Sequence, residues 1–159
     1  MQPRIDFYTA SPEALKAMLA LETAVSRLPL EKSLIELVKL RASQINGCAF
    51  CVDMHVKEAK IHGERELRLH HVAVWRESPL FSAQERAALE WTEALTQLSP
   101  HGVSDAIYAN VREQFSEQEL SELSFLVVAI NGWNRLSVAF RNVPGSADKQ
   151  FGLDKAGLA

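Results

Sequence analysis

Apolar residues recur at every third or fourth position along most of the chain, which is the spacing of amphipathic α-helices. Clusters of Ser, Asn, Gly and Pro interrupt this pattern and mark helix ends. No segment alternates apolar and polar residues as a half-buried strand would. The pattern therefore predicts an all-α fold of about six to eight helices. They are expected at residues 12–28, 30–45, 48–61, 64–75, 83–98, 105–115, 117–130 and 133–140.

Two capping boxes mark helix starts, because Ser82 is followed by Glu85, and Ser116 by Glu119, at the required three-residue spacing. In such a box, the serine and glutamate side chains each bond the other residue's backbone N–H. These two helix starts are therefore the best defined boundaries in the sequence.

The length fits one domain, residues 1–159, with a helical core at about 13–142. The tail, 143–159, is rich in Gly, Pro and Asp, and we expect a loop or a frayed end there. Ile-Asn-Gly occurs at 45–47 and again at 130–132, in both cases where an apolar helix should end. A degenerate internal repeat and a coincidence explain three shared residues equally well.

Composition narrows the classes of function. The net charge is -3 and the basic residues form no cluster, which argues against nucleic acid or an anionic membrane as partner. No apolar run reaches the ~18 residues of a membrane span, and the N-terminus lacks the apolar core of a secretory signal. We therefore expect a cytoplasmic protein. In a reducing compartment the only two cysteines, Cys48 and Cys51, indicate redox chemistry or metal binding.

The cysteine pair stands close to two other reactive groups. Cys48, Cys51 and His55 are three and four residues apart, so they share one helix face. This spacing suits a disulfide, which needs Cα atoms about 4.4–6.8 Å apart, and a helix N-terminus favours a thiolate. His55 can exchange a proton with a thiol. Glu36 lies on the mostly apolar helix before, where burial would raise the pKa of its carboxyl and suit a general base.

Other assignments of these four residues stay open. They could bind zinc, although structural zinc sites use mostly Cys and His. The cysteines could also be inert core residues. A thioredoxin fold is excluded, because its motif needs strands. Three further histidines are expected at the surface or at helix ends: His62, His70 and His71. The tryptophans, expected in the core or in a subunit interface, are Trp75, Trp91 and Trp133.

One spacing carries a family resemblance. The pattern E-x(6)-S-x(4)-C-x(2)-C-x(3)-H is met by Glu36, Ser43, Cys48, Cys51 and His55. It closely resembles the signature of the AhpD-like alkylhydroperoxidases in the carboxymuconolactone decarboxylase superfamily. The stretch 73–89 is also similar to this family, and the resemblance covers about residues 13–142.

The resemblance implies an AhpD-like helical fold, homo-oligomers (trimers or hexamers), and thiol peroxidase or disulfide reductase activity with no bound cofactor or metal. By that analogy, Cys51 attacks the peroxide and becomes a sulfenic acid, and Cys48 closes the disulfide. Glu36 and His55 would form the proton relay. The reductant would be an external dithiol, such as a dihydrolipoyl group on a partner protein, or a thiol reductase. Lipoyl-linked members have a histidine just before the second cysteine, where this chain has Phe50.

Two rival functions stay open. One is a lyase related to the decarboxylases of the same superfamily, although those members generally lack the cysteine pair. The other is a non-enzymatic redox sensor or metal-binding assembly module, which stoichiometric zinc in the purified protein would favour.

Overall fold

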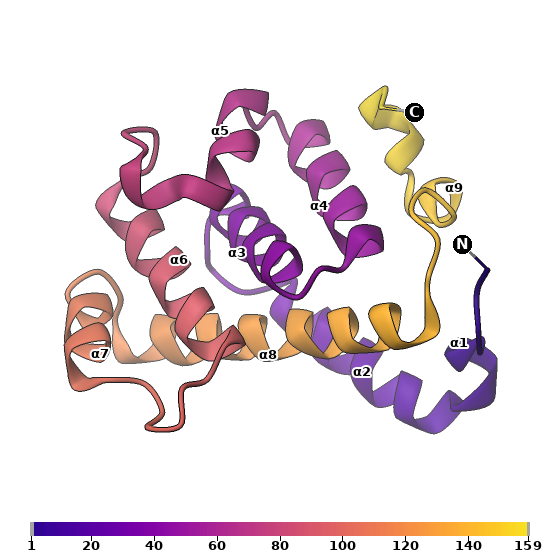
Figure 1. The fold of residues 1–159 in the computed structure, drawn as a ribbon, viewed down its shortest axis with the longest axis horizontal. Coiled ribbons are helices and arrows are strands. Elements are labelled where there is room, and N and C mark those ends of the chain that lie inside the picture. The colour runs from indigo at the N-terminus through magenta and orange to yellow at the C-terminus, as the bar shows by residue number, and fades with distance from the viewer. Residues whose placement is uncertain (1, 159) are drawn as a thin grey trace.

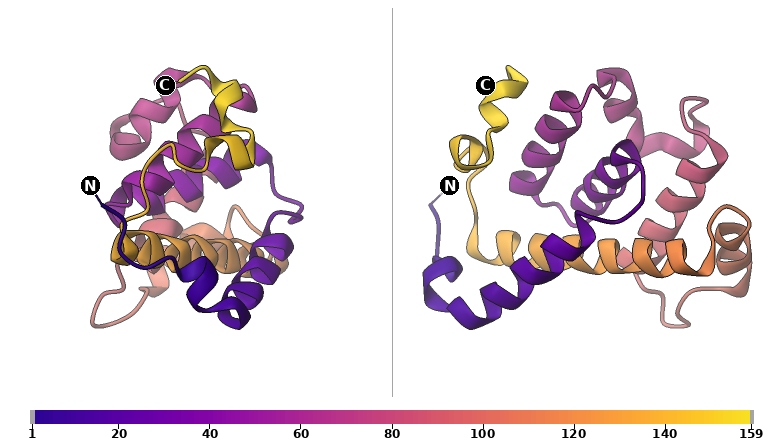
Figure 2. Two further views of the ribbon diagram at one scale, coloured as in Figure 1. Left: turned by 90° about the vertical axis from the view of Figure 1, so that its right-hand side faces the viewer. Right: turned by 180° about the vertical axis from the view of Figure 1, so that it is seen from behind.

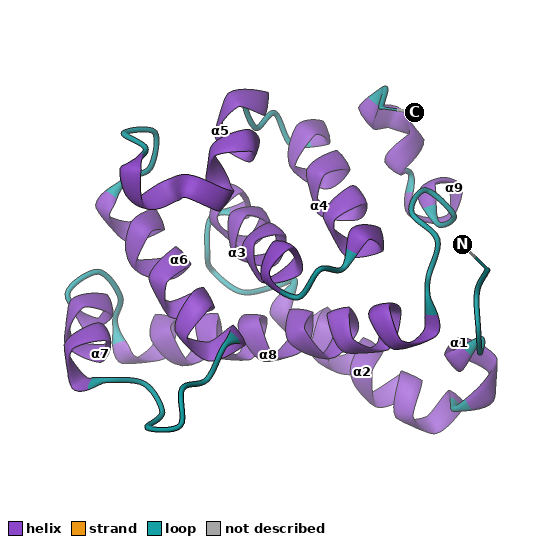
Figure 3. Cartoon of the chain, in the orientation of Figure 1, coloured by secondary structure: helices purple, strands orange, loops and turns teal. Residues whose placement is uncertain are grey.

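The computed structural model describes residues 2–158, and within them the fold is all-α, as the sequence predicts (Figure 1, Figure 3). Seven α-helices have six residues or more, and two have four. No β-strand occurs between residues 2 and 158; an isolated bridge pairs Ser99 with Gly102. The elements are α1 (Phe7–Ala10), α2 (Pro12–Val25), α3 (Lys32–Ile45), α4 (Ala49–Ile61), α5 (Glu66–His71), the 3₁₀-helix η1 (Val72–Glu77), α6 (Ala83–Thr96), α7 (Asp105–Arg112), α8 (Glu117–Phe140), α9 (Asp148–Phe151) and the 3₁₀-helix η2 (Leu153–Ala156).

The long helix α8 spans the width of the molecule, with α3, α4 and α6 above it in the view of Figure 1. Figure 2 shows from behind that α2 runs alongside α8. By length and composition alone, α8 would be long and apolar enough to cross a membrane. In this fold it packs against α2, α3, α4, α6 and α7, and one face of it, with Leu123, Leu126 and Val127, belongs to the core.

Helix α3 lies at the centre of the fold, as its nearly all-round apolar sequence predicts. Leu34 and Val38 pack into one core cluster with residues of α6, α7 and α8. Leu37 and Leu40 pack into a second cluster with residues of α4, α5, η1 and α6. Because both sides of α3 are packed, Glu36 is carried on a rigid element.

Both predicted capping boxes are present, at the starts of α6 and α8. In each, the serine Oγ accepts the glutamate N–H, and the glutamate carboxylate accepts the serine N–H. Other boundaries differ from the prediction. Residues 7–10, which precede the first expected helix, form α1, and the Asp6 side chain caps it at the N–H of Tyr8. The helix expected at 64–75 is replaced by α5 followed directly by η1, and Val74 within η1 has a non-helical backbone.

The predicted helix break at Asn131 and Gly132 is wrong, because α8 continues through both residues. The side-chain amide of Asn131 has hydrogen-bond partners inside the fold: its Nδ2 donates to Val127 O at 2.9 Å and to Thr96 Oγ1 at 3.0 Å. Gly132 gives room for α2, since a Cβ there would lie 2.9 Å from Met18 Cε. The two Ile-Asn-Gly stretches therefore have different backbones, a helix end in one case and a helix interior in the other.

The expectation that residues 143–159 form a loop or a frayed end is wrong for residues 148–151 and 153–156. Helix α9 and η2 form there, and η2 packs against α4 with Leu153 only 2% exposed. Lys57 of α4 donates to Asp148 Oδ2 at 2.7 Å, and Ala147 packs against the cysteine pair. The segment therefore covers one side of α4.

Candidate active site

The turn between α3 and α4 positions the cysteines. Gly47 has a φ of 65°, a left-handed conformation that favours glycine, and it reverses the chain. Cys48 is the N-cap of α4, and its Sγ accepts the Cys51 N–H at 3.3 Å. The sequence predicted Cys48 inside the first helical turn; the structure places it just before that turn, still at the positive end of the helix.

Cys48 and Cys51 are joined by a disulfide, with their Cα atoms 5.3 Å apart. Both are nearly fully buried, at 1% and 4% exposed. Cys51 lines a cavity of about 260 Å³, and Cys48 lies outside that lining. A reagent in the cavity would therefore meet Cys51 first.

The walls of this cavity are mainly apolar. Side chains from α1, α2, α4, α8 and α9 form them: Tyr8, Leu19, Phe50, Met54, Ile130, Trp133 and Phe151. The polar or reactive lining residues are Glu22, Lys39, Cys51, His55, Glu58 and Ser137. An apolar pocket with a few polar groups at one end is typical of a small-molecule site.

The structure brings Glu36 and His55 together, and adds Glu58. His55 Nδ1 lies 2.7 Å from Glu58 Oε2, at hydrogen-bonding distance, and 3.6 Å from Glu36 Oε2. Glu36 and His55 are 7% and 6% exposed. Sequence reasoning missed Glu58, although its position three residues after His55 on α4 is a spacing at which helical side chains meet.

The two carboxylates control the charge of His55. Burial lowers the pKa of His55, but the neighbouring Glu36 carboxylate and the hydrogen bond to Glu58 outweigh burial and raise this pKa above its ordinary value. Burial raises the pKa of Glu58, and the bond to His55 outweighs it, so the pKa of Glu58 is lowered. His55 therefore keeps its proton to a higher pH than a free histidine, and donates Nδ1–H to Glu58.

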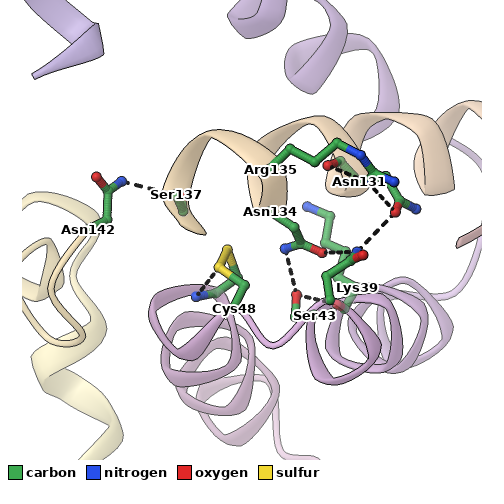
Figure 4. Close-up of a disulfide and its surroundings, with 10 residues drawn as sticks. Lys39, Ser43, Cys48, Asn131, Asn134, Arg135, Ser137 and Asn142 are labelled. Carbon is green, nitrogen blue, oxygen red and sulfur yellow. Dashed lines mark hydrogen bonds between the residues drawn. A yellow bond between two sulfur atoms is a disulfide. The ribbon is translucent and has the colours of Figure 1, made fainter. Parts of the chain in front are cut away.

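A chain of hydrogen-bonded side-chain amides connects the cysteine turn to α8 (Figure 4). Asn46 Nδ2 donates to both Asn131 Oδ1 and Asn134 Oδ1 at 2.9 Å. Asn134 Nδ2 donates to Ser43 Oγ at 3.0 Å, and Ser43 Oγ donates to Lys39 O at 2.7 Å. Ser43, a member of the sequence signature, therefore helps to fix the end of α3 against α8.

The other histidines have separate surroundings. His62 is the C-cap of α4, with its side chain 40% exposed and its Nδ1 3.7 Å from Glu36 Oε1. His71 Nδ1 lies 3.0 Å from Ser78 Oγ, and His70 is exposed. The expectation of surface or helix-end positions agrees with His62 and His70. The position of His62 near Glu36 was not expected.

The tryptophans differ among themselves. Trp75 and Trp91 are buried in the two core clusters, as expected. Trp133 instead lines the cavity, and its Nε1 donates to Glu22 Oε2 at 3.0 Å. Glu22 also holds Lys39 Nζ at 2.7 Å. These contacts fix one wall of the cavity.

Comparison with known proteins identifies the family. The model of the carboxymuconolactone decarboxylase family matches residues 12–94, which include the turn, both cysteines and His55. This chain belongs to the carboxymuconolactone decarboxylase family. The uncharacterized protein YdfG of Bacillus subtilis is 38% identical over 142 residues, which cover 89% of this chain and 97% of YdfG.

Solved structures place the chain in the AhpD-like branch of the family. ATU0492 of Agrobacterium tumefaciens is a protein of unknown function with a suggested AhpD role in antioxidant defence. It is 47% identical, with a TM-score of 0.87 over 90% of this chain and 98% of ATU0492. The debrominase Bmp8 has a TM-score of 0.77 at 18% identity, over 92% of this chain and 78% of Bmp8, and thus shares the fold. The resemblance to AhpD-like proteins and the all-α fold are confirmed.

Proposed function

We propose that this protein is a thiol-dependent peroxidase that reduces hydrogen peroxide or organic peroxides. One observation carries the proposal: Cys51 and His55 line one cavity, while Cys48 is bonded to Cys51 from outside that lining. This arrangement suits a thiol peroxidase. The attacking thiol and an acid–base group both face the substrate cavity, and the resolving thiol is within reach of the attacking sulfur. The suggested role of ATU0492 in antioxidant defence supports it.

The reaction starts from the reduced pair. The Cys51 thiolate attacks one peroxide oxygen, so an S–O bond forms and the O–O bond breaks. The leaving oxygen takes a proton from His55 and departs as an alcohol or water. The Cys48 thiol then attacks the sulfur of the Cys51 sulfenic acid, which forms the disulfide and releases water. An external dithiol reduces the disulfide by exchange and is itself oxidised to a disulfide.

The surroundings favour each of these steps. Cys51 lies in the first turn of α4, where free N–H groups and the helix dipole stabilise a thiolate. Glu36 Oε2 is buried and has no hydrogen-bond partner among residues 2–158. It lies 3.6 Å from His55 Nδ1, so an approach of less than about 1 Å would bring Glu36 within reach of a proton on His55.

Two serine variants test the roles of the cysteines. In a peroxide-consumption assay with dithiothreitol, Cys51→Ser should fall to the uncatalysed rate. Cys48→Ser, reduced first and then freed of dithiothreitol, should reduce a single peroxide per chain and stop at the Cys51 sulfenic acid, because no thiol is left to resolve it. Wild-type turnover in Cys51→Ser would show that Cys51 is not the nucleophile. If the Cys48→Ser/Cys51→Ser double variant decarboxylated a carboxymuconolactone, the protein would be a lyase and the peroxidase proposal would be wrong.

The electron donor in this proposal is an external dithiol. Phe50 stands where lipoyl-linked members of the family have a histidine, so one group for proton transfer is missing. Phe50→His should therefore raise the rate with dihydrolipoamide more than the rate with dithiothreitol. If Phe50→His changed the rates with both reductants equally, Phe50 would not determine which electron donor the protein uses.

We also propose a homo-oligomer. Helix α8 presents three large apolar side chains that are exposed in the single chain: Phe125, Val128 and Val138. A second copy of the chain would bury such a surface. Sedimentation equilibrium would give the subunit number, and a monomer at micromolar concentration would contradict this assembly.

A further inference from the structure

Glu36, His55 and Glu58 form a group whose chemistry goes beyond proton transfer. Ligand atoms of the three residues all lie within 4.8 Å of one another. Glu36 comes from α3, and the other two lie one turn apart on α4. The zinc set considered from the sequence included both cysteines, but these are bonded to each other. Glu58 takes their place in the group that the fold assembles.

The buried carboxylate of Glu36 lacks a partner on one side. Glu36 is 7% exposed, and its Oε2 accepts no hydrogen bond from the described residues. Such an oxygen costs free energy unless a donor or a cation satisfies it. His55 Nδ1 is 3.6 Å away, which is too far for a hydrogen bond. Glu36 Oε2 therefore points into the group with unused capacity to bind a positive charge.

The spacing suits two ligands of one small cation. Zn–N and Zn–O bonds of about 2.0–2.2 Å in tetrahedral geometry separate two ligand atoms by roughly 3.3–3.6 Å. The separation of Glu36 Oε2 from His55 Nδ1, 3.6 Å, is of this size. The separation of His55 Nδ1 from Glu58 Oε2 is 2.7 Å, a hydrogen bond that the cation would replace. Opening it requires a movement of less than about 1 Å.

Charge and access also suit a cation. Two carboxylates and a neutral imidazole carry a charge of about −2, which one divalent cation neutralises. The positive group nearby, Lys39, is already paired with Glu22 at 2.7 Å. His62, with a 40% exposed side chain, lies 3.7 Å from Glu36 Oε1. This side of Glu36 therefore lies next to a partly exposed side chain.

We propose that Glu36, His55 and Glu58 bind one small divalent transition-metal cation, with water as the fourth ligand. Imidazole and carboxylate ligands suit Zn²⁺ and similar ions. The cation takes the place of the proton on His55 Nδ1. An occupied site therefore prevents His55 and Glu36 from relaying protons, so that the ion would restrain the chemistry at Cys51.

Zinc binding to the untagged, full-length Cys48→Ser/Cys51→Ser variant tests the site, because this variant has no thiolate to bind the ion. Equilibrium dialysis after removal of metal with a chelator should give one Zn²⁺ per chain at micromolar free zinc. Adding Glu36→Gln or Glu58→Gln should weaken the affinity by at least ~10-fold, because each removes a charged ligand while keeping its shape. Glu90→Gln is the matched control, since Glu90 bonds Asn110 elsewhere on the surface. It should bind zinc like the parent variant.

Co²⁺ supplies a readout that does not depend on the glutamine variants. The Co²⁺-loaded double serine variant should show visible d–d bands of a low-coordinate site, and circular dichroism should show unchanged helicity in every variant. Binding of less than half an equivalent of Zn²⁺ to the double serine variant would overturn the proposal. Parent-like affinity in either folded glutamine variant, with Glu36 or Glu58 altered, would overturn it as well.

Discussion

Asn134→Ala tests how the fold holds the cysteine turn in place. Asn134 is fully buried in α8, where its amide bonds Asn46 at 2.9 Å and Ser43 at 3.0 Å. Losing two hydrogen bonds should cost about 1–3 kcal/mol, and the void left by the amide adds roughly 1 kcal/mol. Asn46 keeps its bond to Asn131, and Ser43 keeps its bond to Lys39 O, so neither partner is left unsatisfied. We therefore expect the free energy of unfolding to fall by about 2–4 kcal/mol.

Thermal and urea unfolding followed by circular dichroism would measure this loss. For a chain of this length the Tm should fall by about 4–16 °C. All variants are compared at one protein concentration, because association would shift the apparent stability. Asn110→Ala is the matched control: Asn110 has one exposed bond, to Glu90, and its loss should cost less than about 0.5 kcal/mol. If Asn134→Ala costs no more than Asn110→Ala, the amide chain does not hold the turn against α8.

Three further substitutions probe other parts of the account. Glu58→Gln removes a charge facing His55, so the pKa of His55 should fall in an NMR titration; an unchanged pKa would contradict the pairing. The raised pKa of His55 contributes stability that is fully present below the pKa of the unfolded chain and is lost as pH rises through the folded-state pKa, and Glu58→Gln should reduce this pH dependence. Leu153→Ala should cost about 2–4 kcal/mol in urea unfolding, because this buried side chain fastens η2 to α4; a loss below about 0.5 kcal/mol would mean that η2 does not pack there. Ser116→Ala should cost about 1 kcal/mol by removing the cap on the Glu119 N–H, and unchanged stability would refute that cap.

Features with local causes were predictable from the sequence. The capping boxes at Ser82 and Ser116 involve residues three positions apart, and both are present. The all-round apolar sequence of α3 indicated its central position correctly. The family resemblance implied that Glu36 and His55 act together, and the structure places the two side chains 3.6 Å apart.

Features that depend on distant contacts were not predictable in this way. Asn131 and Gly132 resemble a helix end locally, but Thr96 and Met18, from other helices, accommodate them inside α8. The C-terminal segment lacks helical periodicity, and its short helices depend on packing against α4. Asn134 is 88 residues from its partner Asn46, so no local signal connects them.

Anaerobic titration of the reduced protein with an organic hydroperoxide tests the central claim most directly. Mass spectrometry and quantification of the alcohol would be followed together. The account predicts that one peroxide per chain becomes one alcohol while Cys48 and Cys51 lose both thiols and form one disulfide. It also predicts that Cys48→Ser stops with one oxygen added to Cys51. Reduction of the peroxide with both thiols intact, or equal peroxide reduction by Cys51→Ser, would contradict the account.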